Sequence, residues 1–240
     1  HPITVAYGAA TKLILATSPL GFVNRTNFTT QPVITVQDAS GNTVTNASIS
    51  IDVAIDSGAL TGTTQVRSVN GVATFAGLGK NGTVGSKTLT FTKTGGGLTA
   101  ATFGFTLTYG AVDHLAMTSP STSVNDKVFA TQPVVTIQDA DNNTVADSTA
   151  TVTLTSSNAT IGGTLLNSAV AMDAVSGVAD FSGKNVKLTG TTGVKNLTAT
   201  IAGGITLTNQ VTITFGVATQ LVLSRDAADA VNAVAFVTQP

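Results

Sequence analysis

Thr30-Gln31-Pro32-Val33-Ile34-Thr35-Val36-Gln37-Asp38-Ala39 decides the fold, because residues 131–140 repeat it with only two exchanges between isoleucine and valine. The tripeptide Thr-Gln-Pro occurs a third time at residues 238–240. The prolines of the three copies are 101 and 107 residues apart. This spacing is the length of one small β-sandwich domain and is far longer than a solenoid or propeller repeat. The sequence therefore predicts tandem domains of ordinary size.

Other motifs keep the same register and predict the domain boundaries. An aromatic residue followed by glycine precedes a strand-like segment at Tyr7-Gly8, Tyr109-Gly110 and Phe215-Gly216. Residues 1–8 are expected to be the last strand of a preceding repeat. Residues 9–110 and 111–216 are expected to be two complete repeats, and residues 217–240 the first strand or strands of a truncated third.

Residues 48–56 show the clearest strand pattern. Ile49, Ile51 and Val53 alternate with small or polar residues, which is typical of an antiparallel strand with one buried face. Turn formers such as Asn70-Gly71 separate about seven such segments in each complete repeat. All twelve acidic residues are aspartate, so the good helix former glutamate is absent. We predict an all-β chain of tandem immunoglobulin-like sandwiches, each with about seven antiparallel strands, and no significant helix.

The composition excludes several classes of function. The net charge is −1 and the eleven basic residues are scattered, so no cationic surface for nucleic acid is expected. No apolar run reaches the roughly 18–20 residues that span a bilayer. The chain has no cysteine and only two histidines, His1 and His114, which excludes thiol catalysis and a zinc site here. Asp113 and His114 are expected on opposite faces of a strand, which argues against a catalytic triad. We therefore expect no enzymatic activity and no catalytic residues.

Taken together, the motifs resemble the bacterial immunoglobulin-like repeats of invasin- and intimin-like adhesins and other large surface proteins. The resemblance rests on residues 10–13, 28–42 and 70–75, and it covers essentially the whole chain. It implies a location at the cell surface or in the extracellular space. It also implies a structural module, such as a stalk, filament or surface-layer segment, that provides reach, rigidity and self-association. The alternatives are an adhesin repeat for a receptor, glycan or neighbouring cell, and an accessory repeat of a secreted enzyme.

Two sequence features favour the structural role. Only Gly110-Ala111-Val112 and Gly216-Val217-Ala218 separate consecutive repeats, which limits bending between domains. The chain has no tryptophan and two tyrosines, so the residues that usually dominate binding hot spots are scarce. The expected partners are copies of the same chain, head to tail or side by side, or neighbouring repeats. Predicted strands at residues 3–7 and from Leu221 onward expose edges that could pair with a neighbouring sandwich, although simple truncation also explains them.

Two kinds of candidate site remain. Asp139, Asp141 and Asn143 place oxygen-bearing side chains at alternate positions, as calcium loops do, which makes Ca²⁺ the one cofactor to consider. A plain turn explains the same pattern, because the chain lacks the glutamate that a calcium loop of the EF-hand type uses. Seven sequons are candidates for N-glycosylation and are expected in turns or at strand ends: Asn24, Asn27, Asn46, Asn81, Asn142, Asn158 and Asn196.

Overall fold

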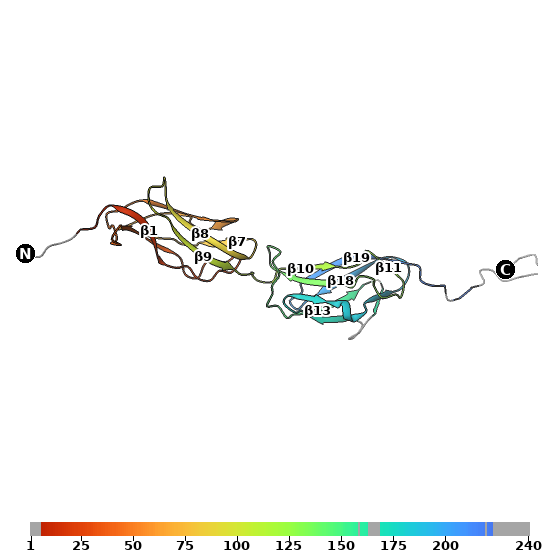
Figure 1. Cartoon of the computed structure of the whole chain (residues 1–240). Coiled ribbons are helices and arrows are strands. Elements are labelled where there is room, and N and C mark those ends of the chain that lie inside the picture. Colours follow the sequence, from red (N-terminus) through yellow and green to blue (C-terminus); the bar gives the residue numbers. More distant parts are fainter. Residues whose placement is uncertain (1–5, 158, 163–168, 219, 223–240) are drawn as a thin grey trace, which may run out of the picture.

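The computed structural model describes residues 6–157, 159–162, 169–218 and 220–222. Its strands form two β-sandwiches that lie end to end (Figure 1). The predicted all-β, immunoglobulin-like class is confirmed, and the helical element among the described residues is one short 3₁₀ turn, η1 (Phe181–Lys184). No helix in the described ranges has the length and apolar character needed to cross a bilayer.

The first sandwich consists of strands β1 to β9. One sheet has the order β1-β2-β6, the second has the order β5-β3-β8-β9, and a small ribbon pairs β4 with β7, all antiparallel. The strands are β1 (Ala10–Thr17), β2 (Val33–Asp38), β3 (Ser50–Ile55), β4 (Ala59–Thr61), β5 (Gln65–Arg67), β6 (Val72–Thr74), β7 (Gly79–Asn81), β8 (Gly85–Lys93) and β9 (Ala101–Leu107).

The second sandwich repeats this plan with strands β10 to β19. Its sheets have the orders β10-β12-β16 and β11-β19-β18-β13-β15, and β14 pairs with β17. The strands are β10 (His114–Thr118), β11 (Thr122–Val124), β12 (Val134–Gln138), β13 (Thr151–Ser156), β14 (Thr160–Gly162), β15 (Val170–Asp173), β16 (Val178–Asp180), β17 (Lys187–Thr189), β18 (Gly193–Thr200) and β19 (Thr206–Thr214).

Each sandwich contains more strands than the roughly seven that were predicted, and each includes parallel contacts, among them a bridge from Lys12 to Thr99 in the first. In the second sandwich, β11 pairs parallel to β19, and in the first, Val23 makes the corresponding parallel bridge to Thr108. The first segment of each sandwich therefore starts in one sheet and then crosses to the edge of the other. Alternation of apolar residues predicts strands but carries no information on their direction, so this feature could not be predicted.

Each sandwich has its own hydrophobic core. The alternation in β3 buries Ile51 and Val53, as predicted. In the first core, the rings of Phe75 and Phe91 pack edge to face, with their centroids 5.4 Å apart. In the second core, Phe181 is fully buried. Two separate apolar clusters mean that neither sandwich needs the other to bury its core.

The strands predicted at the two ends are only partly within the described residues. The segment 3–7 begins among residues 1–5, which lie outside them, and Tyr7 is not in a strand. The segment from Leu221 continues into residues 223–240, which also lie outside the described part. Leu221 and Val222 are exposed and belong to no strand.

Candidate functional site at the interdomain joint

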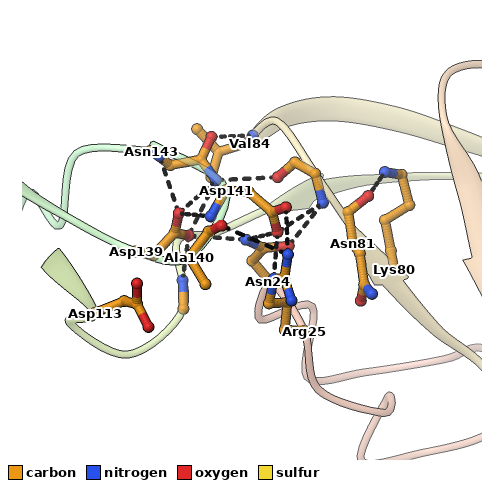
Figure 2. A network of polar contacts seen from close by, with 12 residues as sticks. Asn24, Arg25, Lys80, Asn81, Val84, Asp113, Asp139, Ala140, Asp141 and Asn143 are labelled. Carbon is orange, nitrogen blue, oxygen red and sulfur yellow. Dashed lines mark hydrogen bonds and ion pairs between the residues drawn. The ribbon is translucent and has the colours of Figure 1, made fainter.

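A network of polar contacts connects the two sandwiches where the chain passes from one to the other (Figure 2). We call it the interdomain joint. It consists of residues from two loops of the first sandwich, the connection, and the turn after β12, namely Asn24, Arg25, Gly82, Val84, Gly110, Asp139, Asp141 and Asn143. The turn, residues 139–143, is called the aspartate loop below.

The aspartate loop is organised by its first residue. The Oδ1 atom of Asp139 accepts hydrogen bonds from the backbone N–H of Asp141 at 3.0 Å and of Asn143 at 2.9 Å. Asn142 lies in the left-handed region with φ +64°, which asparagine tolerates better than most residues. Asp139 is only 1% exposed. The loop therefore holds its shape through its own hydrogen bonds and presents Oδ2 of Asp139 to the first sandwich.

Asn24 is the centre of the joint on the side of the first sandwich. Its Nδ2 donates to Oδ2 of Asp139 and to Oδ2 of Asp141, each at 2.8 Å. Its Oδ1 accepts from the backbone N–H of Gly82 at 2.9 Å. The side chain is 1% exposed. A buried amide with its oxygen and both amide protons engaged can hold the two sandwiches in one orientation, because any displacement breaks bonds that water cannot easily replace.

Arg25 adds a second anchor beside Asn24. Its Nε donates to Oδ2 of Asp141 and its Nη2 to Oδ1, both at 2.8 Å, so the guanidinium binds the carboxylate with two parallel bonds. This bidentate geometry fixes direction as well as distance. The Arg25 side chain is half exposed, which weakens the ion pair through solvent screening. Arg25 contributes more to orientation than to stability.

The connection itself takes part in the joint through Gly110. Its backbone N–H donates to Oδ2 of Asp139 at 2.9 Å. A Cβ atom at this position would lie 2.9 Å from the backbone oxygen of Asn24, so a side chain would push the two sandwiches apart. The neighbouring Tyr109 and Val112 pack against the core of the second sandwich. The short connection is therefore held on both sides.

Asn143 and the β7–β8 turn close the joint on its far side. Oδ1 of Asn143 accepts from the backbone N–H of Val84 at 3.1 Å. Nδ2 of Asn143 donates to the carbonyl of Gly82 at 3.0 Å, and the N–H of Gly82 donates to Oδ2 of Asp141 at 3.2 Å. These bonds use backbone groups that sequence changes leave in place.

The hydrogen bonds keep both carboxylates of the aspartate loop ionised. Burial raises the pKa of Asp139, but hydrogen bonds from Gly110, Asn143 and Asn24 outweigh it and hold the pKa well below its usual range. Hydrogen bonds from Arg25 and Asn24 lower the pKa of Asp141 to about 2. In the first sandwich, next to the joint, burial lowers the pKa of Lys80, whose Nζ donates to the carbonyl of Asn81 (Figure 2). At neutral pH the joint therefore contains two carboxylates and the Arg25 cation.

The three residues named as calcium candidates all belong to the joint. Oxygens of Asp139 and Asp141 accept hydrogen bonds from Asn24, Arg25 and Gly110. Among the described residues, no three His, Cys, Asp or Glu side chains are grouped so that they could hold a metal ion. The oxygens have a clear role in joining the sandwiches, and calcium binding stays a prediction.

The glycosylation candidates fall into different environments. Asn24 is buried with its amide nitrogen bonded to two carboxylates, which counts against a glycan there. The prediction that all sequons lie in turns or at strand ends is wrong for Asn196, which lies within β18. Asn158 lies outside the described residues. Four acceptors are exposed, and their glycosylation stays a prediction: Asn27, Asn46, Asn81 and Asn142.

The expectation that Asp113 and His114 point apart is also wrong. Nδ1 of His114 lies 3.0 Å from Oδ2 of Asp113, and Nε2 lies 3.1 Å from Oδ1 of Asn142. The two side chains meet because Asp113 precedes β10, so the alternation of a strand does not apply to it. Both contacts are to oxygens that accept, and a neutral imidazole, with its single N–H, can donate to only one of them at a time.

Sequence analysis did not single out the contribution of Asn24 and Arg25 to the joint. A signal was present, since an asparagine precedes the repeated phenylalanine by four residues in both repeats, at Asn24 and Asn125. Asn24 was considered only as a sequon, and Asn125 was not singled out at all. Its partner lies more than a hundred residues away along the chain, and one sequence does not reveal such a pairing.

Comparison with known proteins found solved structures of similar fold, each at low sequence identity. No protein-family model and no curated protein sequence matches the chain. Among solved structures, Yersinia pseudotuberculosis InvD is 22% identical, with 92% of this chain and 63% of that chain covered and a TM-score of 0.40. Invasin, described as a bacterial integrin-binding protein, is 20% identical, with 85% and 40% covered and a TM-score of 0.36. Domains 4 and 5 of the S-layer protein SbsC are 16% identical, with 87% and 99% covered and a TM-score of 0.31.

These neighbours include the bacterial immunoglobulin-like adhesin domains that the sequence motifs resemble. A glycosyl hydrolase family 2 enzyme from Bacteroides cellulosilyticus is also among the matches. The chain spans less than two thirds of the invasin and InvD chains. The likeness concerns the fold, and it assigns no activity or partner to this chain.

Proposed function

We propose that this chain is a structural segment of an extracellular, cell-surface protein, in which consecutive immunoglobulin-like sandwiches are held at a fixed angle to form a stiff spacer. The interdomain joint carries this proposal. A flexible string of domains needs only a linker, whereas here Asn24, Gly110 and Asp139 make a buried contact between two domains that each have their own core.

The chemistry of the joint suits a spacer. Most of its contacts are directional hydrogen bonds to ionised carboxylates, which are shorter and stronger than those between neutral groups. Such bonds, above all the bidentate pair of Arg25 with Asp141, fix orientation as well as distance. The arrangement thus favours reach and rigidity over the recognition of a ligand.

Small-angle X-ray scattering in solution tests this function. The proposal predicts the maximum dimension and the scattering profile of two sandwiches end to end, as in Figure 1. A matched variant with a flexible glycine-serine segment inserted between Ala111 and Val112 serves as the uncoupled reference. We expect this variant to scatter as a broad ensemble of bent forms. If the unmodified chain scatters like the inserted variant, it is not a stiff spacer.

A further inference from the structure

The far end of the second sandwich repeats one half of the joint. Figure 1 shows that β19 ends on the side of this sandwich away from the first. There, Oδ1 of Asn125 accepts from the backbone N–H of Gly190 at 2.9 Å, which is the bond that Asn24 makes with Gly82. A Cβ atom on Gly216 would lie 3.3 Å from the backbone oxygen of Asn125, in the place that Gly110 takes beside Asn24.

The partner of this half-joint is missing among the described residues. Nδ2 of Asn125 donates no hydrogen bond there, whereas Nδ2 of Asn24 binds two carboxylates. Phe215 is 85% exposed, although its counterpart Tyr109 packs against the core of the next sandwich. Asn125 also lines a pocket of about 360 Å³. We call it the distal socket, and it is lined by Asn125, Asp126, Lys127, Thr189, Gly216 and Val217.

The near end of the first sandwich carries the complementary half. Oδ2 of Asp38 accepts from the backbone N–H of Gly8 at 2.7 Å, and Oδ1 accepts from the N–H of Asn42 at 2.9 Å. Asp139 makes the same two kinds of bond with Gly110 and Asn143. Residues 38–42, and the corresponding loop of any such repeat, are called the Asp38 loop below, and they have the same kinds of hydrogen bond as the aspartate loop of the joint.

We propose that the distal socket binds an Asp38 loop, carried by a further immunoglobulin-like repeat that follows Gly216 in the same polypeptide. This inference rests on the proposed function and names its partner. In the second joint, Nδ2 of Asn125 and the N–H of Gly216 donate to the carboxylate of the aspartate. The sequence supports this partner, because residues 236–240 repeat the Phe-x-Thr-Gln-Pro motif, whose proline precedes Asp38 and Asp139 by six residues.

A second pair of residues, beside the asparagine and the aspartate, determines which loop the distal socket can bind. In the existing joint Arg25 faces Asp141, and the corresponding residues are Asp126 in the socket and Ser40 in the Asp38 loop. Oδ1 of Asp126 accepts from Nζ of Lys187 at 2.7 Å and from Thr189 at 3.1 Å. Its Oδ2 is left for a serine hydroxyl, which can donate. An aspartate there would lose the guanidinium and meet a second carboxylate, so the socket fits a loop of the Asp38 type.

A tandem protein tests the proposal with repeats whose structure is described. Residues 1–216 are joined directly to residues 9–240 of a second copy, so that Gly216 takes the place of Gly8 before the second Asp38 loop. Spin labels on Thr155→Cys in the first copy and Thr102→Cys in the second report their distance, since the natural chain has no cysteine. We expect a narrow distance distribution, as across the existing joint.

Asn125→Asp in the first copy is the decisive variant. The introduced carboxyl keeps the acceptor for Gly190 but removes both donors and faces Asp38 with a like charge. We expect it to broaden the distribution several-fold. A broad distribution in the unsubstituted tandem, or a narrow one that Asn125→Asp leaves unchanged, would overturn the proposal.

A second label pair separates this proposal from the proposed function. Labels on Thr102→Cys and Thr155→Cys, both in the first copy, report the existing joint of the same tandem molecule. A narrow distribution there, with a broad one across the new junction, refutes the distal socket alone. Broad distributions at both places refute the stiff spacer and the second joint together.

Discussion

Asn24→Asp is the substitution that isolates the energy of the joint. It is nearly isosteric and keeps the oxygen that accepts from Gly82, so the loops of the first sandwich retain their local bond. It removes the two N–H groups that donate to Asp139 and Asp141, and it places a third carboxylate beside these two. The change therefore acts on the contact between the sandwiches and leaves both cores intact.

The expected loss follows from the bonds that disappear. A hydrogen bond to a charged group contributes about 1.5–3 kcal/mol, so two of them give about 3 kcal/mol after allowance for the partial exposure of Asp141. This corresponds to a shift of about a hundredfold in the equilibrium between closed and open joint. Repulsion among the carboxylates adds to the effect.

Urea denaturation is the assay. With a slope of about 1–3 kcal/mol per molar for a small domain, the sandwich that unfolds first should lose about 1 M or more in its midpoint. The matched control is Asn125→Asp, because Asn125 makes the same kind of bond, with Gly190, but contacts no aspartate loop among the residues that the structure describes. The control should stay within about 0.5 kcal/mol of the unmodified protein. Equal midpoints for Asn24→Asp and the control would refute the reasoning.

Three further predictions concern the same joint. Gly110→Ala should destabilise the joint by about 1–3 kcal/mol through overpacking, because a Cβ atom would lie 2.9 Å from the backbone oxygen of Asn24. Gly8→Ala is the control in the same denaturation assay and should be tolerated, because its Cβ atom would lie 3.6 Å from Asp38. Lowering the pH should leave the joint closed to about pH 4, the usual aspartate pKa, and then open it progressively as the pH falls towards the Asp141 pKa of about 2, because the stabilisation from a depressed pKa is complete above the usual pKa and is lost as the pH falls through the depressed one. Scattering against pH would show this, and opening between pH 5 and 8 would contradict it. Addition of calcium, or its removal with a chelator, should leave the scattering profile unchanged, because Arg25 and Asn24 already bind the oxygens that an ion would need; calcium-dependent stiffening would instead support the calcium hypothesis for Asp139, Asp141 and Asn143.

The fold was largely predictable from the sequence because its signals are local. Alternation in residues 48–56 predicted the buried positions Ile51 and Val53, and the recurrence of residues 30–39 predicted two similar units. The parallel contact between β11 and β19 was not predictable, because the alternation of one strand is the same whichever way its neighbour runs.

The candidate site was predictable only in part. The Asp139 turn could be recognised from its pattern of oxygen-bearing residues. Its partners Asn24 and Arg25 are far away in the sequence, and no sequence pattern indicates that they contact this turn. The meeting of Asp113 with His114 was missed for a different reason, since the strand begins one residue later than the pattern suggested.

The orientation of the two sandwiches is the central claim, and the distance between spin labels on Thr102→Cys in β9 and Thr155→Cys in β13 tests it most directly. Both positions are exposed and outside the joint. Two sandwiches held by the joint predict one narrow distance peak that Asn24→Asp broadens. A broad distribution in the otherwise unmodified protein would contradict the account.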